Sequence, residues 1–118
     1  MNIVTVGVAS RAEVAARFIA AMQDNAQGAH VSFASSRRLF QTLTGPRCEL
    51  LRALMGRGPV TVRQVAQRLQ RDIRAVHRDV QILLRSGLLE RTDDGAIVFP
   101  HDAIHVDFTL TRHRGERP

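Results

Sequence analysis

The sequence predicts one small α+β domain, in which three short helices and a β-hairpin are flanked by further elements at both ends. The 118-residue chain is long enough for one apolar core and too short for two. Apolar residues follow the helical period in successive segments between residues 44 and 87, and a two-strand pattern around an Asp-Gly turn comes next. Alternating apolar residues near both ends of the chain predict additional strands.

The N-terminal segment, residues 1–43, predicts a strand followed by a helix. The stretch MNIVTVGV carries valine at every second position, which predicts a strand over residues 3–8. Ser10 and Glu13 have the spacing of a capping box, so a helix is expected over residues 11–23.

Four later points in the chain carry helix-start signals. A serine pair, a Thr-Gly-Pro sequence, a second capping box and an aspartate all favour the first turn of a helix. Only two residues separate the third of these helices from the cap of the fourth, which indicates a tight helix-to-helix turn. The signals are, in order, Ser35 or Ser36, Thr44 with Pro46, Thr61 with Gln64, and Asp72.

The last of these helices has the clearest apolar period, and a hairpin is expected after it. Gly87 can adopt the left-handed conformation that ends a helix. The sequences LLER, TDDG and AIVF then predict a strand, a turn and a second strand. The expected buried residues of the helix are Ile73, Val76, Val80, Leu83 and Leu84.

The C-terminal segment predicts one more strand and a flexible tail. Apolar and polar residues alternate strictly over residues 104–110, and the final RHRGERP is expected to be disordered. The predicted organisation is therefore an N-terminal strand-helix extension (1–43), a central domain (44–100), and a C-terminal strand and tail (101–118).

Positive charge is concentrated in the central segment. The formal net charge is +6, and all 17 basic residues other than histidine are arginines. Seven arginines and two aspartates between residues 57 and 85 give that segment a net charge of +5. Such a distribution favours a polyanionic partner, although GC-rich codon usage alone also raises the arginine content.

Several function classes are disfavoured by the composition. The single cysteine, Cys48, permits no intrachain disulfide or cysteine-based zinc site, and a small apolar core role is expected for it. The histidines lack companions that would complete a metal site, and no nucleophile, base and orienting acid converge, so we expect no metal, no cofactor and no enzyme activity. Without a long apolar run or a leader, we expect a cytoplasmic protein with no membrane partner.

The order of elements from residue 44 to residue 100 resembles the winged helix-turn-helix regulators. The matching pieces are PRCELLRAL, TVRQVAQRL, DIRAVHRDVQILLRSG and LLERTDDGAIVF, and the last of these is similar to the domain end in MarR-like and ArsR-like proteins. The strings VSFASSRRLFQTLTGPRCELLRAL, HRDV and FPHDAIHVDF resemble a group of small prokaryotic predicted DNA-binding proteins that includes antitoxins. This resemblance implies DNA binding and, as an alternative, an antitoxin role.

The candidate DNA-contacting residues lie mainly on the last helix of the central domain. With Ile73 at the centre of the buried stripe, the residues that fall opposite it are Arg71, Ala75 and Arg78. The competing interpretation is that these arginines form the ordinary solvated face of an amphipathic helix. Asp79, beside this face, is expected to orient Arg78 or Arg74. The predicted base readers are Arg71, Arg74, Ala75 and Arg78, and the predicted phosphate contacts are Arg57, Arg63, Arg68, Arg85 and Arg91.

The sequence therefore predicts a sequence-specific regulator of transcription that binds double-stranded DNA. We expect a homodimeric repressor that autoregulates its operon, with the terminal segments forming the dimer. The alternative for these segments is that they pack on their own domain as a small added sheet. The alternative function is an antitoxin that binds and neutralises a toxin protein through its terminal strands or tail.

Overall fold

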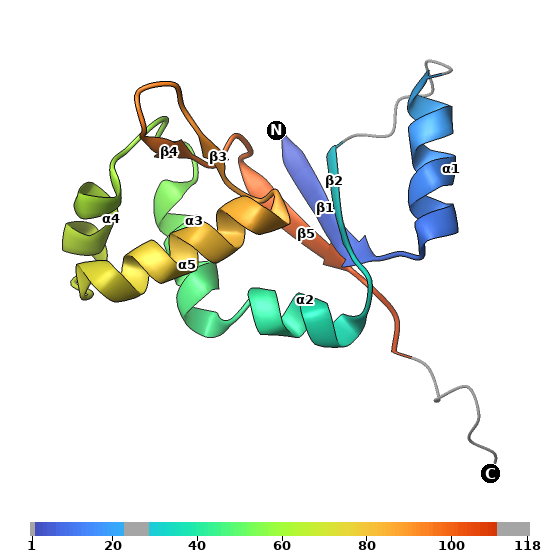
Figure 1. The fold of residues 1–118 in the computed structure, drawn as a ribbon, viewed down its shortest axis with the longest axis horizontal. Coiled ribbons are helices and arrows are strands. Elements are labelled where there is room, and N and C mark those ends of the chain that lie inside the picture. Colours follow the sequence, from blue (N-terminus) through green and yellow to red (C-terminus); the bar gives the residue numbers. More distant parts are fainter. Residues whose placement is uncertain (1, 23–28, 111–118) are drawn as a thin grey trace, which may run out of the picture.

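A parallel three-stranded sheet brings the two ends of the chain together. The computed structural model describes residues 2–22 and 29–110; the end of the first predicted helix at residue 23 and the whole predicted flexible tail, residues 112–118, lie outside the described residues. Strands β1 (Ile3–Val8), β2 (Ala29–Phe33) and β5 (Ala103–Asp107) form the sheet in the order β2-β1-β5 (Figure 1). The terminal strands thus pair with each other in one chain.

Asn2 and Asp102 connect the first and last strands of the sheet. The Asn2 backbone N–H donates to Asp102 Oδ2 at 2.8 Å, and the Asp102 backbone N–H donates to the Asn2 carbonyl at 2.7 Å. The Asn2 side chain also donates to the Pro100 carbonyl at 2.9 Å. These contacts fix the register in which Gly7 of β1 lies opposite Asp107 of β5.

Helix α1 (Arg11–Met22) connects β1 to β2 and is exposed to solvent. Its capping box is confirmed, because the Ser10 side chain accepts from the Glu13 backbone N–H at 3.2 Å and the Glu13 side chain accepts from the Ser10 backbone N–H at 3.3 Å. In Figure 1, α1 lies beyond β2, away from the other helices. The apolar side chains of Val14, Phe18 and Ile19 are exposed.

The remaining helices begin at the predicted signals. Ser35 caps α2 (Ser36–Thr42), Pro46 occupies the first turn of α3 (Gly45–Leu54), and both bonds of the Thr61–Gln64 capping box are present at the start of α4 (Val62–Leu69). Asp72 caps α5 (Ile73–Ser86), and Gly87 ends it in the left-handed conformation. The turn between α4 and α5 passes through Gln70, whose φ is 53°.

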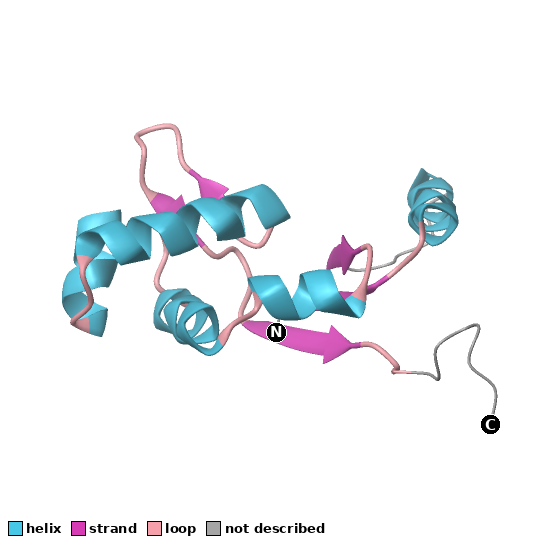
Figure 2. Ribbon diagram, turned by 60° about the horizontal axis from the view of Figure 1, so that its bottom comes forward, coloured by secondary structure: helices cyan, strands magenta, loops and turns pink. Residues whose placement is uncertain are grey.

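The hairpin is shorter than the sequence suggests. Strands β3 (Glu90–Arg91) and β4 (Ile97–Val98) pair antiparallel, and Ile97 also exchanges two backbone hydrogen bonds with Val60, at 2.8 and 2.9 Å. The residues expected to extend the strands, such as Leu88 and Phe99, are instead buried in the core. Figure 2 shows the hairpin in the half of the domain that holds α4 and α5, with the sheet in the other half.

One hydrophobic core unites the sheet, helices α2 to α5 and the hairpin in a small α+β domain. The terminal segments therefore contribute to the same core as the central one. Three expected core residues are not in it: Ile73 is 43% exposed, because it lies in the first turn of α5, Leu84 is only half-buried against the core, and Cys48 of α3 is exposed. The core residues are Val4, Val6, Leu39, Leu50, Leu51, Leu54, Val65, Ala66, Val76, Val80, Leu83, Leu88, Leu89, Ile97 and Phe99.

The predicted C-terminal strand also ends early. It covers Ala103–Asp107, and Phe108 after it packs edge-on against Phe40 of α2, with ring centroids 5.2 Å apart. Among the described helices, none has the length and apolar character needed to cross a membrane.

Candidate functional site

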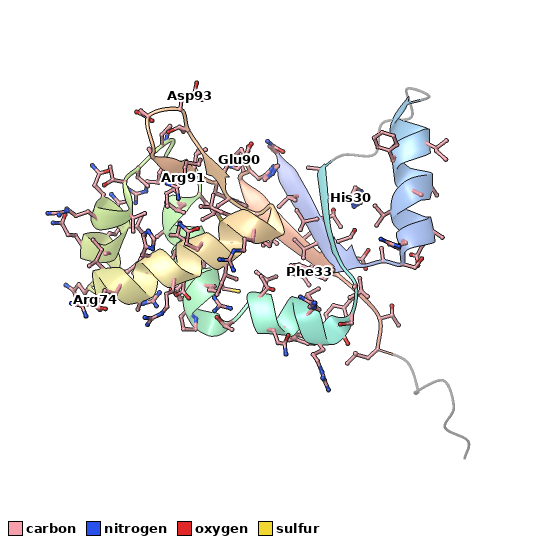
Figure 3. The ribbon with its side chains drawn as sticks, in the orientation of Figure 1. His30, Phe33, Arg74, Glu90, Arg91 and Asp93 are labelled. Atoms are coloured by element: carbon pink, nitrogen blue, oxygen red, sulfur yellow. The ribbon has the colours of Figure 1, made fainter. Side chains whose placement is uncertain are left out.

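Helix α5 presents a row of arginines on its outward face. Val76, Val80 and Leu83 are fully buried and define its inward face. At about 100° per residue, the direction opposite to them falls on Arg74, Arg78 and Arg85, which are all exposed and are here called the arginine row. Figure 3 shows Arg74 near the N-terminal end of α5, at the edge of the molecule.

The arginine row differs from the face expected with Ile73 as the inward centre. The core centre lies between Val76 and Val80, and this rotates the outward face away from Ala75, which is half-buried. Two of the four predicted base readers, Arg74 and Arg78, thus lie at the centre of the exposed face.

Asp79 is buried and binds two arginines, so the expectation that it orients Arg74 or Arg78 is wrong. It is the one charged residue among the buried described residues, with 8% of its surface exposed. Arg47 Nε donates to Oδ1 at 3.0 Å, and Arg71 Nη2 donates to Oδ2 at 2.7 Å. Arg71 is therefore held against its own domain, unlike the free side chain expected of a base reader.

Arg47 extends this network to α2. Its Nη1 atom donates to the Gln41 carbonyl at 2.7 Å and the Thr42 carbonyl at 3.3 Å, which satisfies acceptors at the end of α2. A single carboxylate thus connects α2, α3, α5 and the turn before α5. The role of Arg47 could not be predicted from the sequence, because the residue lies 32 positions from Asp79.

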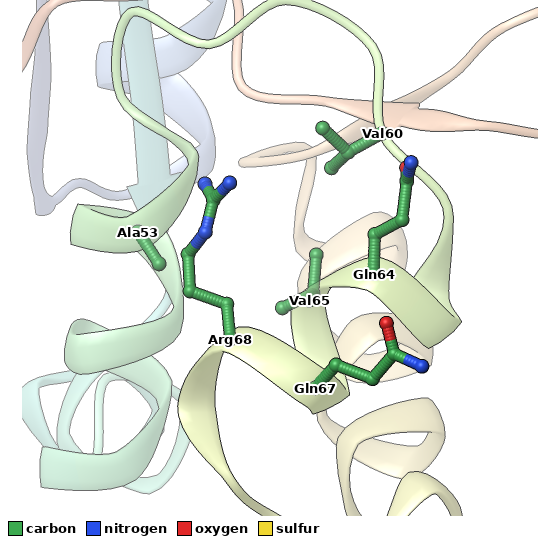
Figure 4. A pocket seen from close by; sticks show the side chains of 6 residues that line it. All are labelled: Ala53, Val60, Gln64, Val65, Gln67 and Arg68. Atoms are coloured by element: carbon green, nitrogen blue, oxygen red, sulfur yellow. The ribbon is translucent and has the colours of Figure 1, made fainter.

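The arginines of α4 point to two different hollows. Arg63 and Arg71 line a shallow cleft of about 430 Å³ between α4 and the start of α5, together with Gln67 and Gln70. Arg71 Nη1 is buried there without a hydrogen-bond partner. Arg68 lies in a separate hollow of about 210 Å³ against α3, and Figure 4 shows its guanidinium reaching past Ala53 toward the Val60 loop.

The hairpin presents carboxylates at its tip. Asp93 and Asp94 are exposed, and Figure 3 shows Asp93 at the outermost point of the turn. Hydrogen bonds from the Thr92 hydroxyl and from the backbone at Ala96 lower the pKa of Asp94. Arg91 is exposed, but its Nη1 donates to the Gly95 carbonyl at 3.1 Å, across the turn.

The remaining predicted DNA contact lies outside α4, α5 and the hairpin. Arg57 is exposed in the loop between α3 and α4. Among the histidines, His101 has a structural role, because its Nδ1 lies 3.2 Å from Asn2 Oδ1 and its ring packs edge-on against Phe99. The described residues contain no group of three histidine, cysteine or acidic side chains that could hold a metal ion.

Comparison with known proteins finds one family. A family model described as HVO_A0114 matches residues 42–106, from the end of α2 into β5, and this is more than half of the 118-residue chain. No curated protein and no solved structure matches the chain.

Proposed function

The chain belongs to the HVO_A0114 family, and from that premise we propose that it is a winged helix-turn-helix protein that binds double-stranded DNA and regulates transcription. The observation that carries the proposal is the arginine row on the outward face of α5. An exposed helix about 10–12 Å across fits the major groove, where arginine forks can make two hydrogen bonds to a guanine edge.

The arrangement of α3, α4, α5 and the hairpin supports this proposal. A turn through Gln70 joins α4 to α5, as between the two central helices of a helix-turn-helix. The hairpin and Val60 supply the strands of a small wing. Because the wing tip carries Asp93 and Asp94, we propose that α5 makes the principal contact and that the wing does not insert deeply into a groove.

The predicted contact residues take different roles in this arrangement. Arg74 and Arg78 are the proposed base readers, and Arg57 and Arg63 are proposed phosphate contacts because they are exposed on the loop and helix beside α5. Arg71 is proposed to position the turn through Asp79. Ala75, which is half-buried beside the arginine row, is proposed to allow close approach of the helix backbone. Arg68 and Arg91 are proposed as secondary contacts, because both side chains lie against their own domain.

We further propose a homodimeric repressor that autoregulates its operon. A 12-residue helix such as α1 is marginal alone in water, and its apolar side chains Val14, Phe18 and Ile19 have no cover in the described part of the chain. A second copy seated on this face would present two α5 helices to half-sites roughly one DNA turn apart. Sedimentation equilibrium should give a dimer mass for the full chain and a monomer mass for Phe18→Glu.

Fluorescence anisotropy with DNA from upstream of the gene and with a shuffled duplex, each across a salt series, tests the DNA proposal. We expect tight binding only to the upstream duplex, with a steep salt slope. Arg78→Ala should cost about 1 to 3 kcal/mol on the specific duplex alone, whereas Arg63→Ala should weaken both duplexes alike. Arg52→Ala, an exposed arginine of α3 with no assigned role, is the matched control. Equal losses on both duplexes for Arg78→Ala would contradict its base-reading role, and no binding to either duplex would refute the function.

The antitoxin alternative is favoured by one observation, the position of β5 at an edge of the parallel sheet. An edge strand of this kind can accept a strand from another protein. Coexpression with the product of the adjacent gene should then yield a stable complex. Deletion of residues 101–118 would remove β5 and disturb the sheet, so a truncation that tests the tail should begin at residue 111.

A further inference from the structure

A hollow between α2 and the C-terminal half of α5 adjoins the end of the arginine row. Its volume is about 250 Å³, and it is open to solvent. Residues from β2, α2 and α5 meet there, so the hollow joins the sheet half of the domain to the end of the arginine row. Its lining residues are Phe33, Arg38, Thr42, Ile82, Arg85 and Ser86.

Two exposed arginines line this hollow, and none of its lining residues is acidic. Arg38 comes from α2 and Arg85 is the last member of the arginine row. Within the described part of the chain, neither guanidinium makes a hydrogen bond or an ion pair. They differ in this respect from Arg47 and Arg71, which share an ion pair with the Asp79 carboxylate.

The remaining lining groups leave the recognition of an anion to the two guanidinium groups. The Thr42 hydroxyl donates to the Arg38 carbonyl at 3.0 Å, and the Ser86 hydroxyl donates to the Leu83 carbonyl at 2.8 Å, so the hydrogens of both are engaged. Phe33 and Ile82 are half-buried and add apolar surface. A DNA phosphodiester suits this lining, because its anionic oxygens can accept hydrogen bonds from the two arginines and its sugar can contact the apolar surface.

We propose that Arg38 and Arg85 together hold one backbone phosphate of the bound DNA. This rests on the proposed function and extends its contact surface to α2. Arg85 lies eleven residues after Arg74, a separation of about 16 Å along a helix. The major groove is about 12 Å wide, which is less than this separation. When Arg74 contacts bases in the groove, Arg85 therefore lies at the sugar-phosphate backbone. Arg38 precedes the family-matched residues 42–106, so this part of the footprint is supplied by the N-terminal segment.

The test compares Arg38→Ala with Arg37→Ala in the full chain. Arg37 is the adjacent exposed arginine of α2 and does not line the hollow. We expect Arg38→Ala to weaken upstream and shuffled duplexes alike, roughly three- to ten-fold at about 0.1 M salt, and to reduce the salt slope by about one. Arg37→Ala should leave both the affinity and the salt slope unchanged. Arg38→Lys should restore the salt slope more fully than the affinity, because lysine keeps the positive charge but lacks the forked guanidinium group of arginine.

Phosphate ethylation interference identifies the contact directly. Ethylation of one particular phosphate should weaken the wild-type complex but should have no effect on binding by Arg38→Ala or by Arg85→Ala. In the double variant, the same phosphate alone should have become insensitive to ethylation. If the wild type binds DNA and Arg38→Ala behaves as Arg37→Ala does, the inference is wrong while the proposed function stands. If the wild type binds no DNA, both are overturned.

A free anion is the competing occupant. Inorganic phosphate that raises the Tm of the wild type but not of Arg38→Ala, with no change in DNA affinity, would show a small-anion site and overturn the assignment to DNA. Both arginines are exposed, so circular dichroism should show unchanged folding of the variants and attribute any loss to the contact.

Discussion

Replacement of Asp79 by asparagine should destabilise the domain by about 3 kcal/mol. The carboxylate accepts two charge-assisted hydrogen bonds, from Arg47 at 3.0 Å and from Arg71 at 2.7 Å, and each such bond contributes about 1.5 to 3 kcal/mol. Asparagine keeps one acceptor oxygen and turns N–H donors toward the second arginine. The arginine side chains are 17% and 28% exposed, so water recovers part of the loss. The expected value is therefore at the lower end of the range of about 3 to 5 kcal/mol for breaking a buried ion pair.

Urea unfolding followed by circular dichroism measures this effect. For a domain of this size, about 3 kcal/mol corresponds to a fall in Tm of about 12 °C. The matched control is Asp93→Asn at the exposed hairpin tip, which should stay within about 0.5 kcal/mol of the wild type. If Asp79→Asn were no less stable than Asp93→Asn, the network would contribute no net stability and the reasoning would be refuted.

Two further changes test the sheet and the hairpin. Gly7→Ala should cost about 1 to 3 kcal/mol of unfolding free energy, because a Cβ there would lie 2.6 Å from the Asp107 carbonyl oxygen. The control is Gly45→Ala, which should be neutral because its Cβ would meet nothing within 4 Å. Equal effects of the two substitutions would contradict the close approach of β1 and β5. Thr92→Val should raise the pKa of Asp94, because the hydroxyl is the first cause of its lowered value. Since that pKa is lowered in the folded state, Asp94 stabilises the hairpin at neutral pH and loses this contribution below about pH 4. An NMR titration of the Asp94 carboxyl carbon measures the shift, and an unchanged pKa in Thr92→Val would remove the hydroxyl as the cause.

The helix starts and the hairpin turn could be predicted from the sequence because their signals are local. Ser10, Thr61 and Asp72 each accept a hydrogen bond from a backbone N–H three residues later. Gly87 takes a backbone conformation that other residues adopt at a cost. These interactions depend on neighbours within one turn, so residue type and spacing are sufficient to predict them.

The centre of the buried face of α5 could not be fixed from the sequence. Ile73 has the apolar character and the period of a core residue, yet the structure leaves it exposed because it lies in the first turn of the helix. Asp79, a charged residue, is buried instead, because Arg47 from a distant part of the chain supplies its partner. The local sequence pattern of a helix carries no information about which distant parts of the chain pack against it.

The sequence by itself determined the α+β class, the order of the helices and hairpin, and the concentration of positive charge between residues 57 and 85. Only the tertiary structure decided that the terminal strands pair in one sheet, which arginines are free, and which are held by Asp79. The physical reason is the range of the interactions. Caps and periods act within a few residues, whereas strand pairing and buried ion pairs join residues that are distant in the chain and adjacent only after folding.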